Sequence, residues 1–308
     1  MKTPIEVFDK RAKAALQDAA IEKLCTGAVW SEGPVWVPAQ QCVLWSDIPN
    51  NRMLSWSEAQ GLGEWATGVE YTNGHCLDLD GSLLHCSHGQ RAIVRTPLVG
   101  GRLLGETPMR MVVDRYQGRR LNSPNDIVVK RNGSIWFTDP PYGILSDREG
   151  HAAPSEQSAN HVFRFDPKTQ DLQAATDWLQ EPNGLAFSPD EKRLYVSDTS
   201  AALKTDGSGH HHIAVFDVDT EDRLHNPRVF AEINPGLADG FRLDTQGWIY
   251  TSSEDSVQVY HPDGTRLAKL YVPEKVGNLC FGGPLRNQLF VAASRSLYRF
   301  TLNTQGNL

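Results

Sequence analysis

Six oxygen-bearing side chains occupy equivalent positions in a phrase that the sequence repeats. Four copies are clear and two are looser; the residues are Asn73, Asn125, Asn183 and Asp239 in the first group, and Glu32 and Asn278 in the second. The set combines two carboxylates with four amides and includes neither sulfur nor imidazole. Hard oxygen donors of this kind suit Ca²⁺ and, less strictly, Mg²⁺ or Mn²⁺, whereas Zn²⁺ usually recruits His or Cys. A fold that gathered these side chains would create a site for one divalent cation.

The elements that carry these residues repeat as well. Each residue begins a short apolar stretch, which is followed by a turn rich in Gly, Asp or Asn and by a second apolar stretch. The copies start at 32, 73, 125, 183, 239 and 278, so successive copies are 41, 52, 58, 56 and 39 residues apart. Repeats of this length with several strands each are typical of β-propellers. We therefore predict an all-β, six-bladed β-propeller in which the first strand of every blade lines a central channel.

The third copy indicates four strands per blade, over 126–130, 135–139, 161–167 and 172–178, with an Asn-Gly hairpin turn between the first two. The sixth copy has only three, over 278–283, 288–294 and 296–302, while residues 21–27 have strand character and no blade of their own. We predict that 21–27 completes the last blade and closes the ring. Residues 1–20 are then an N-terminal extension with a short amphipathic helix, and 21–308 form one propeller domain.

Two long connections, 142–160 and 199–212, link the second and third strands of their blades. Chain direction places them at the end of the propeller where the first strands begin, so we expect them to roof the site. The run of three His at 210–212 is expected to be an exposed part of such a loop, with adventitious metal binding as the alternative. The second strands end in Asp47, His88, Asp139 and Asp198, for which we expect hydrogen bonds to backbone amides or support of the site.

Composition excludes several function classes. The formal net charge of −7 offers no support for nucleic-acid binding, and no apolar run approaches the roughly 20 residues of a membrane span. The first 20 residues have no continuous apolar core of a signal peptide, so a cytoplasmic location is expected. The five Cys are odd in number and form no CxxC, which favours reduced thiols, although Cys76 and Cys86 flank one hairpin turn. We expect a monomer or homodimer.

Several longer phrases carry a family resemblance. "SEGPVW", "NSPNDIVVKRNGSIWFTDPPYGI", "EPNGLAFSPDEKRLYVSD", "DGFRLDTQGWIY" and "GNLCFGG" resemble the SMP-30/gluconolactonase/LRE-like family, and bacterial-type gluconolactonases in particular. The resemblance implies a six-bladed propeller with a divalent cation in its channel. It implies that Glu32, Asn125, Asn183 and Asp239 bind the cation and that Asp239 is the catalytic base. It also implies hydrolysis of sugar lactones such as glucono-1,5-lactone.

The expected mechanism combines the cation with this carboxylate. The ion, Ca²⁺ by preference with Mg²⁺, Mn²⁺ or Zn²⁺ as alternatives, would polarise the lactone carbonyl while Asp239 takes a proton from water. Direct attack by the Asp239 carboxylate is a second route. Candidate contacts to the sugar are Asn73, His88, Arg120, Asn122 and Tyr142. Two other functions stay open: a phosphotriesterase or aryl esterase with the same site, and a calcium-binding propeller without catalysis.

Overall fold

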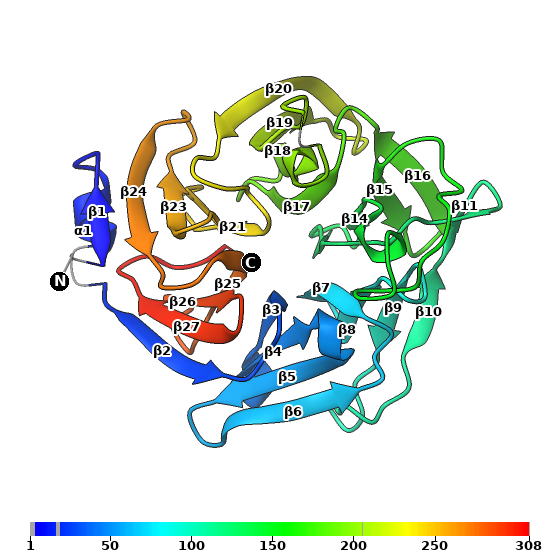
Figure 1. Ribbon diagram of the computed structural model, residues 1–308, viewed down its shortest axis with the longest axis horizontal. Coiled ribbons are helices and arrows are strands. Elements are labelled where there is room, and N and C mark those ends of the chain that lie inside the picture. The colour runs from blue at the N-terminus through cyan, green and yellow to red at the C-terminus, as the bar shows by residue number, and fades with distance from the viewer. Residues whose placement is uncertain (1–3, 17–18, 205, 308) are drawn as a thin grey trace.

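The computed structural model describes residues 4–16, 19–204 and 206–307. Six antiparallel sheets stand around a common axis like the blades of a propeller (Figure 1). In five of them the chain runs from the inner strand to the outer one, so the inner strands are β3, β7, β13, β17 and β21. The sixth sheet has β25 as its inner strand. The predicted six-bladed β-propeller is thus confirmed.

The blades have the following bounds. Blade one comprises β3 (Ser31–Val37), β4 (Cys42–Asp47), β5 (Arg52–Ser57) and β6 (Gly61–Thr67), and blade two β7 (Thr72–Leu77), β8 (Leu83–Ser87), β9 (Ala92–Thr96) and β10 (Arg110–Val113). Blade three comprises β13 (Ile127–Val129), β14 (Ile135–Asp139), β15 (His161–Asp166) and β16 (Asp171–Thr176), and blade four β17 (Pro182–Phe187), β18 (Arg193–Asp198), β19 (His212–Val218) and β20 (Leu224–Glu232). Blade five comprises β21 (Phe241–Leu243), β22 (Ile249–Thr251), β23 (Ser256–Tyr260) and β24 (Arg266–Tyr271), and blade six β25 (Val276–Gly282), β26 (Gln288–Ala293), β27 (Ser296–Thr301) and β2 (Ile21–Thr26).

The ring closes within blade six, where the two ends of the propeller share one sheet. Strand β2 pairs antiparallel with β27, with Ile21 opposite Phe300 and Thr26 opposite Ser296. The N-terminal segment is therefore the outer strand of the last blade, as the sequence predicts. Because the closure is made by ladder hydrogen bonds, β27 does not present an unpaired edge to other chains.

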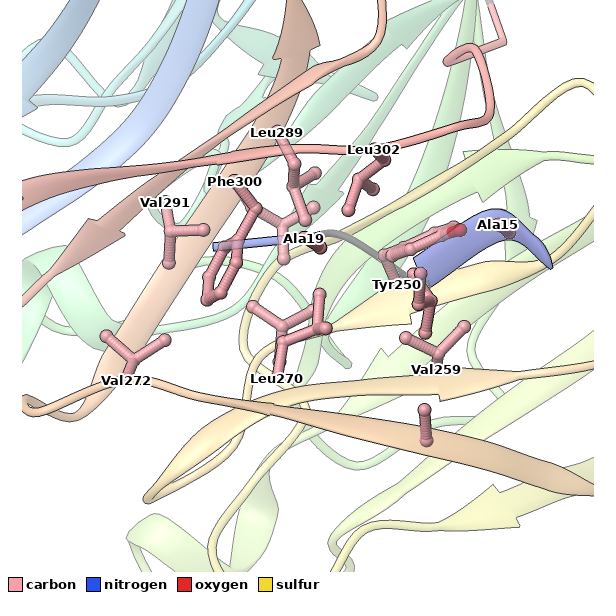
Figure 2. Close-up of a cluster of buried hydrophobic side chains, with 14 of the residues drawn as sticks. Ala15, Ala19, Tyr250, Val259, Leu270, Val272, Leu289, Val291, Phe300 and Leu302 are labelled. Atoms are coloured by element: carbon pink, nitrogen blue, oxygen red, sulfur yellow. The ribbon is translucent and has the colours of Figure 1, made fainter. Parts of the chain in front are cut away.

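The N-terminal extension holds one predicted and one unpredicted element. Helix α1 (Ala12–Leu16) follows β1 (Ile5–Val7), which pairs with β24 as a fifth strand of blade five. Ala15 and Ala19 pack with Tyr250, Leu270 and Phe300 between blades five and six (Figure 2). The helix agrees with the expected amphipathic segment. The strand was not predicted, because three residues are too few to show a strand's alternation and their pairing depends on the free edge of β24.

Apolar side chains pack between neighbouring blades. One cluster joins Trp45 of blade one to Phe290 of blade six, and another joins Trp136 of blade three to Leu194 of blade four. These side chains are at most 1% exposed. The clusters hold neighbouring blades against one another, which allows side chains at equivalent positions of the inner strands to meet. No helix in the described part of the chain is long and apolar enough to cross a membrane.

The remaining elements are short. A two-stranded hairpin, β11 (Arg115–Tyr116) and β12 (Arg119–Arg120), lies in the connection between blades two and three. Four 3₁₀ turns occur in connections: η1 (Pro38–Gln40), η2 (Ile48–Asn50), η3 (Tyr142–Ile144) and η4 (Ser200–Ala202). Turns η3 and η4 begin the two long connections that were expected to roof the site. All five Cys are free, including Cys76 and Cys86.

Candidate active site in the central channel

A cavity of about 380 Å³ opens at the end of the channel where the inner strands begin. Five of the six repeated side chains line it: Glu32, Asn73, Asn125, Asn183 and Asp239. The first four are at most 5% exposed, and Asp239 is partly exposed. The sixth, Asn278, is buried behind them, and its amide oxygen accepts a hydrogen bond from the Leu279 amide. The fold therefore brings together the four side chains for which the sequence predicts cation binding.

Glycines beside these residues allow the inner strands to approach closely. The amide of Gly74 donates to the carbonyl of Asn125 at 2.8 Å, and that of Gly184 donates to the carbonyl of Asp239 at 3.0 Å. A Cβ atom on either glycine would lie within 2.5 Å of the same carbonyl oxygen, well inside van der Waals contact. Backbone hydrogen bonds between blades thus fix the starting points of the inner strands, and with them the positions of the cavity side chains.

Glu32 presents an oxygen that protein groups do not satisfy. Its Oε2 accepts a hydrogen bond from the Gly33 amide at 3.1 Å, while Oε1 is buried and has no partner in the described part of the chain. Burial, followed by the charge of Asp239, raises the pKa of Glu32 well above its ordinary range. A buried carboxylate oxygen without a partner is energetically unfavourable, and a cation would remove that penalty.

Asp239 is held by its backbone, which leaves its carboxylate for the cavity. Its amide donates to Ser252 Oγ at 2.7 Å, and its carbonyl accepts from Ser197 Oγ at 3.1 Å. Burial raises the pKa of the Asp239 carboxyl to about 7, although Lys275 and Asn183 act in the opposite direction. Without a cation, this group therefore changes its charge near neutral pH.

Hydrogen bonds orient two of the amide side chains. Asn183 Nδ2 donates to Thr199 Oγ1 at 3.2 Å, and Asn73 Nδ2 donates to His88 Nε2 at 3.3 Å. His88 can accept this bond because its Nδ1–H donates to the carbonyl of Glu149 at 2.9 Å. Burial also lowers the pKa of His88 to about 4, so the ring is neutral. The amide oxygens take no part in these bonds and are available to a ligand.

The two long connections form the roof of the cavity. The first contributes Tyr142, Leu145, Ser146, Arg148 and Glu149 to its lining, and the second contributes Thr199 and Ala202. The hydroxyls of Tyr142 and Thr199 lie 2.6 Å apart, so the two connections are linked directly above the ring. Trp30, Ile48, Leu237 and Lys275 complete the wall. The lining therefore combines oxygen donors at the floor with apolar and cationic groups at the rim.

Two of the expected substrate contacts do not reach the cavity. The Arg120 guanidinium donates to the carbonyl of Gln90 at 2.6 Å, and Asn122 is fully buried, with hydrogen bonds to Asn160 and Ser155. Neither residue is part of the lining. Both precede the inner strand β13, and their side chains bind the surrounding loops. His88, Asn73 and Tyr142 do line the cavity.

The Asp residues that end the second strands bind backbone amides. Asp47 accepts from the amide of Val29, Asp139 from that of Asn122 and Asp198 from that of Gln180, each at 2.8 Å. In all three cases the amide belongs to the segment that leads into the inner strand of the same blade. These carboxylates therefore fix the approach to the inner strands of blades one, three and four. His88 does not occupy this place in blade two: β8 ends at Ser87, which faces Thr72 as Asp47 faces Ser31. His88 comes one residue later, like Ile48 and Thr199 in their blades, and all three line the cavity.

Sequence reasoning missed several lining residues and one ion pair below them. It identified the roofing connections but not Glu149, Thr199 or Lys275; the only available signal was that Thr199 directly follows the repeated Asp of a second strand. Asp126 and Arg242 form an ion pair at 3.0 Å, with Asp126 1% exposed and Arg242 17% exposed at the side chain. They belong to blades three and five, which are not neighbours, so the pair crosses the channel.

Comparisons with known proteins identify the family to which the chain is similar. Residues 30–295 match the SMP-30/Gluconolactonase/LRE-like region. The chain is 32% identical over 327 residues to a gluconolactonase of Zymomonas mobilis, covering 98% of this chain and 87% of that one. It is 27% identical over 272 residues to the pentonolactonase XacC of Haloferax volcanii, with 85% and 81% covered. A solved gluconolactonase structure from Xanthomonas campestris superposes with a TM-score of 0.88 at 38% identity, covering 97% and 95% of the two chains.

Proposed function

The chain belongs to the SMP-30/gluconolactonase/LRE-like family, and on this basis we propose that it is a lactonase that opens sugar lactones by hydrolysis. The similar proteins named above include a gluconolactonase and a pentonolactonase. The observation that carries the proposal is the convergence of Glu32, Asn125, Asn183 and Asp239 on one cavity of about 380 Å³. That volume suits a monosaccharide lactone and its attacking water.

We propose that these four side chains hold one divalent cation. The unpartnered Oε1 of Glu32 and the raised pKa values of Glu32 and Asp239 are what a cation between two carboxylates would relieve. All donors are oxygens, which favours Ca²⁺, with Mg²⁺, Mn²⁺ and Zn²⁺ as alternatives. Such an ion, when bound, would polarise the lactone carbonyl and stabilise the negative charge that develops on its oxygen.

Asp239 is the proposed general base. Its carboxylate faces the cavity and is not needed to hold the backbone, so one oxygen can accept the proton of the attacking water. Asn73, His88 and Tyr142 are placed to contact the hydroxyls of the sugar. His88 is neutral, and its Nε2 would accept from a sugar hydroxyl by exchanging its present donor, the Asn73 amide. The apolar rim side chains Trp30 and Leu237 would exclude bulk water once a lactone is bound.

The test is hydrolysis measured with a pH indicator on glucono-1,5-lactone, a pentonolactone, an aryl ester and a phosphotriester. Each substrate is assayed with untreated protein, after chelation, and after return of Ca²⁺, Mg²⁺, Mn²⁺ or Zn²⁺. We expect lactone opening that chelation abolishes and one of these ions restores. Preference for the aryl ester or phosphotriester would reassign the site. Cation binding without turnover of any substrate would contradict the proposal and favour a calcium-binding propeller.

A second measurement separates the two roles of Asp239. In a single turnover in H₂¹⁸O, a general base leaves the carboxylate unlabelled and puts the solvent oxygen into the product acid. Direct attack by Asp239 instead forms a mixed anhydride with the opened lactone; when water then attacks the Asp239 carbonyl, an oxygen of the carboxylate leaves with the product and solvent oxygen enters Asp239. Label in Asp239 would therefore establish direct attack. Mass spectrometry of the peptide that contains Asp239 distinguishes these outcomes.

A further inference from the structure

A second group of metal-ligating side chains lies outside the ring of oxygen donors, where β18 ends and β19 begins. Asp198 is the last residue of β18 and faces His212, the first residue of β19, in the strand ladder. His210 precedes β19 by two residues. One carboxylate oxygen of Asp198 and one ring nitrogen of each His all lie within 4.8 Å of one another. Pairing of β18 with β19 therefore fixes the positions of Asp198 and His212. His210 lies at the end of the long connection.

A second, independent observation at His212 indicates a ligand for this group. Its side chain belongs to a residue that is only 7% exposed, and its Nε2 atom is buried without a hydrogen-bond partner in the described part of the chain. An unsatisfied buried polar atom destabilises a fold by about 1–3 kcal/mol. The other members do have partners: Asp198 Oδ2 accepts from His210 Nδ1 at 3.1 Å and from the Gln180 amide at 2.8 Å.

We propose that Asp198, His210 and His212 form a binding site for a borderline divalent transition-metal ion of the Zn²⁺ class. Two imidazole nitrogens and one carboxylate oxygen are a donor set that Zn²⁺ favours, whereas the all-oxygen ring in the channel suits harder cations. Three protein ligands leave a fourth position for water.

The geometry requires only a small adjustment. Ligand atoms around a tetrahedral Zn²⁺ lie roughly 3.4 Å apart, given bonds of about 2.0–2.2 Å. The side chain of His210 is 42% exposed and can rotate toward the other two, while those remain fixed by the β18–β19 ladder. An ion that replaces the proton of the His210–Asp198 hydrogen bond would keep both residues in place and would give His212 a partner.

Such an ion would connect strands β18 and β19 of blade four to the roof of the cavity. Asp198 is followed directly by Thr199, which lines the cavity and contacts both Asn183 and Tyr142. The bound metal would join the two ends of the connection 199–212, because Asp198 precedes it and His210 and His212 lie at its far end. It would therefore hold Thr199 in place without touching the substrate. The expected role is structural, with no part in the chemistry of the lactone.

The test uses chelator-treated full-length protein kept in excess Ca²⁺, so that the channel is occupied by a hard cation. Zn²⁺ is titrated in competition with a chromophoric chelator, and Co²⁺ is used as a spectroscopic probe of nitrogen and oxygen ligation. We expect one Zn²⁺ per chain and a higher melting temperature on binding. His210→Ala should weaken Zn²⁺ at least tenfold and remove the Co²⁺ spectrum. Asp198 is not substituted in this test because it also accepts hydrogen bonds from backbone amides.

His211→Ala is the matched control, since His211 stands in the same run but bonds to the carbonyl of Ile233 and lies outside the group. It should change the Zn²⁺ affinity by less than twofold. His212→Gln, which retains a polar side chain in the buried position, should weaken Zn²⁺ as His210→Ala does. Equal losses from His210→Ala and His211→Ala would mean adventitious binding to a run of His. That result, or no Zn²⁺ binding below millimolar concentration, would overturn the proposal.

Discussion

Thr199 and Asn183 are joined by a hydrogen bond of 3.2 Å in which the amide nitrogen of Asn183 donates to the hydroxyl of Thr199. The donor belongs to the ring of oxygen-bearing side chains, and the acceptor belongs to a roofing connection. The bond turns the amide oxygen of Asn183 away from the roof residue. A residue of the roof thus controls the orientation of a residue in the ring, and the same hydroxyl also meets Tyr142 at 2.6 Å.

Thr199→Val should therefore lower lactone kcat/KM by about tenfold, because a lost hydrogen bond of this kind corresponds to about 1–3 kcal/mol. The valine methyl replaces the hydroxyl at nearly equal size, so Asn183 and Tyr142 lose a partner without gaining space. Thr199→Ser keeps the hydroxyl and should retain most of the activity. Steady-state kinetics and cation titration of both variants check this expectation. Wild-type kinetics for Thr199→Val would show that the hydrogen bond between Asn183 and Thr199 does not contribute to activity.

Asp239→Asn should abolish lactone hydrolysis while retaining the fold and much of the cation affinity. The amide keeps one ligand oxygen of similar size but cannot accept a proton at neutral pH, and loss of a general base typically lowers rates by about 10²–10⁴. Asn183→Ala and Glu32→Ala should instead weaken the cation, so that excess metal partly restores their activity. The measurement is lactone opening against metal concentration for each variant. Near wild-type turnover of Asp239→Asn at saturating metal would leave Asp239 as a ligand only.

Cation affinity should rise with pH through neutrality. The raised pKa values of Glu32 and Asp239, the latter about 7, mean that protons occupy the carboxylates of the cation-free site at lower pH. A cation must displace these protons, so binding weakens as pH falls below 7. Calorimetric titration of Ca²⁺ between pH 5.5 and 8.5 measures this slope, and proton release should be largest below pH 7. An affinity independent of pH would contradict the assignment of these carboxylates as ligands.

The stability of the cation-free protein should show the opposite trend. The folded pKa of Asp239 is raised above the ordinary value of 3.8, so its contribution to stability is fully present at low pH and is lost as pH rises through about 7. Thermal unfolding in chelator should therefore give a melting temperature that falls from pH 5.5 to 8. Asp239→Asn should reduce this decline because it removes one of the two carboxyls in the cavity whose pKa is raised. Added Ca²⁺ should restore stability most at the higher pH.

The ion pair of Asp126 and Arg242 should be essential to the channel. Arg242→Met leaves the carboxylate of Asp126 buried without its partner, and such single losses destabilise proteins by about 3–5 kcal/mol. The double variant Asp126→Asn with Arg242→Met removes both charges and should recover part of that loss. Urea unfolding of the single and double variants measures the difference. Equal stability of the single variant and the wild type would show that Arg242 is not needed.

The closing strand can be tested by truncation. Removal of residues 1–26 deletes β2 and exposes the edge of β27, together with apolar side chains such as Phe300. The truncated chain should be less soluble and should form aggregates at concentrations where the intact protein does not. Light scattering after dilution compares the two chains. Removal of residues 1–8 deletes only β1 and should have a much smaller effect, because β24 keeps its partner β23.

The repeat made the ring predictable and left its surroundings less so. The four predicted cation ligands occupy the same position in successive repeats: Glu32, Asn125, Asn183 and Asp239. A propeller brings residues at the same repeat position together around its central axis. Arg120 and Asn122 were expected to contact the substrate, but they lie outside the cavity lining, and side-chain direction in an irregular loop has no period from which it could be inferred. Lys275 and Glu149 were missed for the same reason. Strand β1 depends on an edge supplied by β24, which lies about 260 residues further along the chain.

The shared last blade has a consequence for how the protein is made. Ile21 is synthesised long before its partner Phe300, because 279 positions separate residues 21 and 300 in the chain. Five blades can fold in order as the chain leaves the ribosome, whereas β2 has no partner strand until β27 is synthesised. Completion of the ring therefore depends on β27, and a nascent chain interrupted before residue 296 would carry β2 without its partner and an incomplete blade six. Such a chain would expose the unpaired edges of β2 and β26, which chaperones and proteases recognise as incomplete folding.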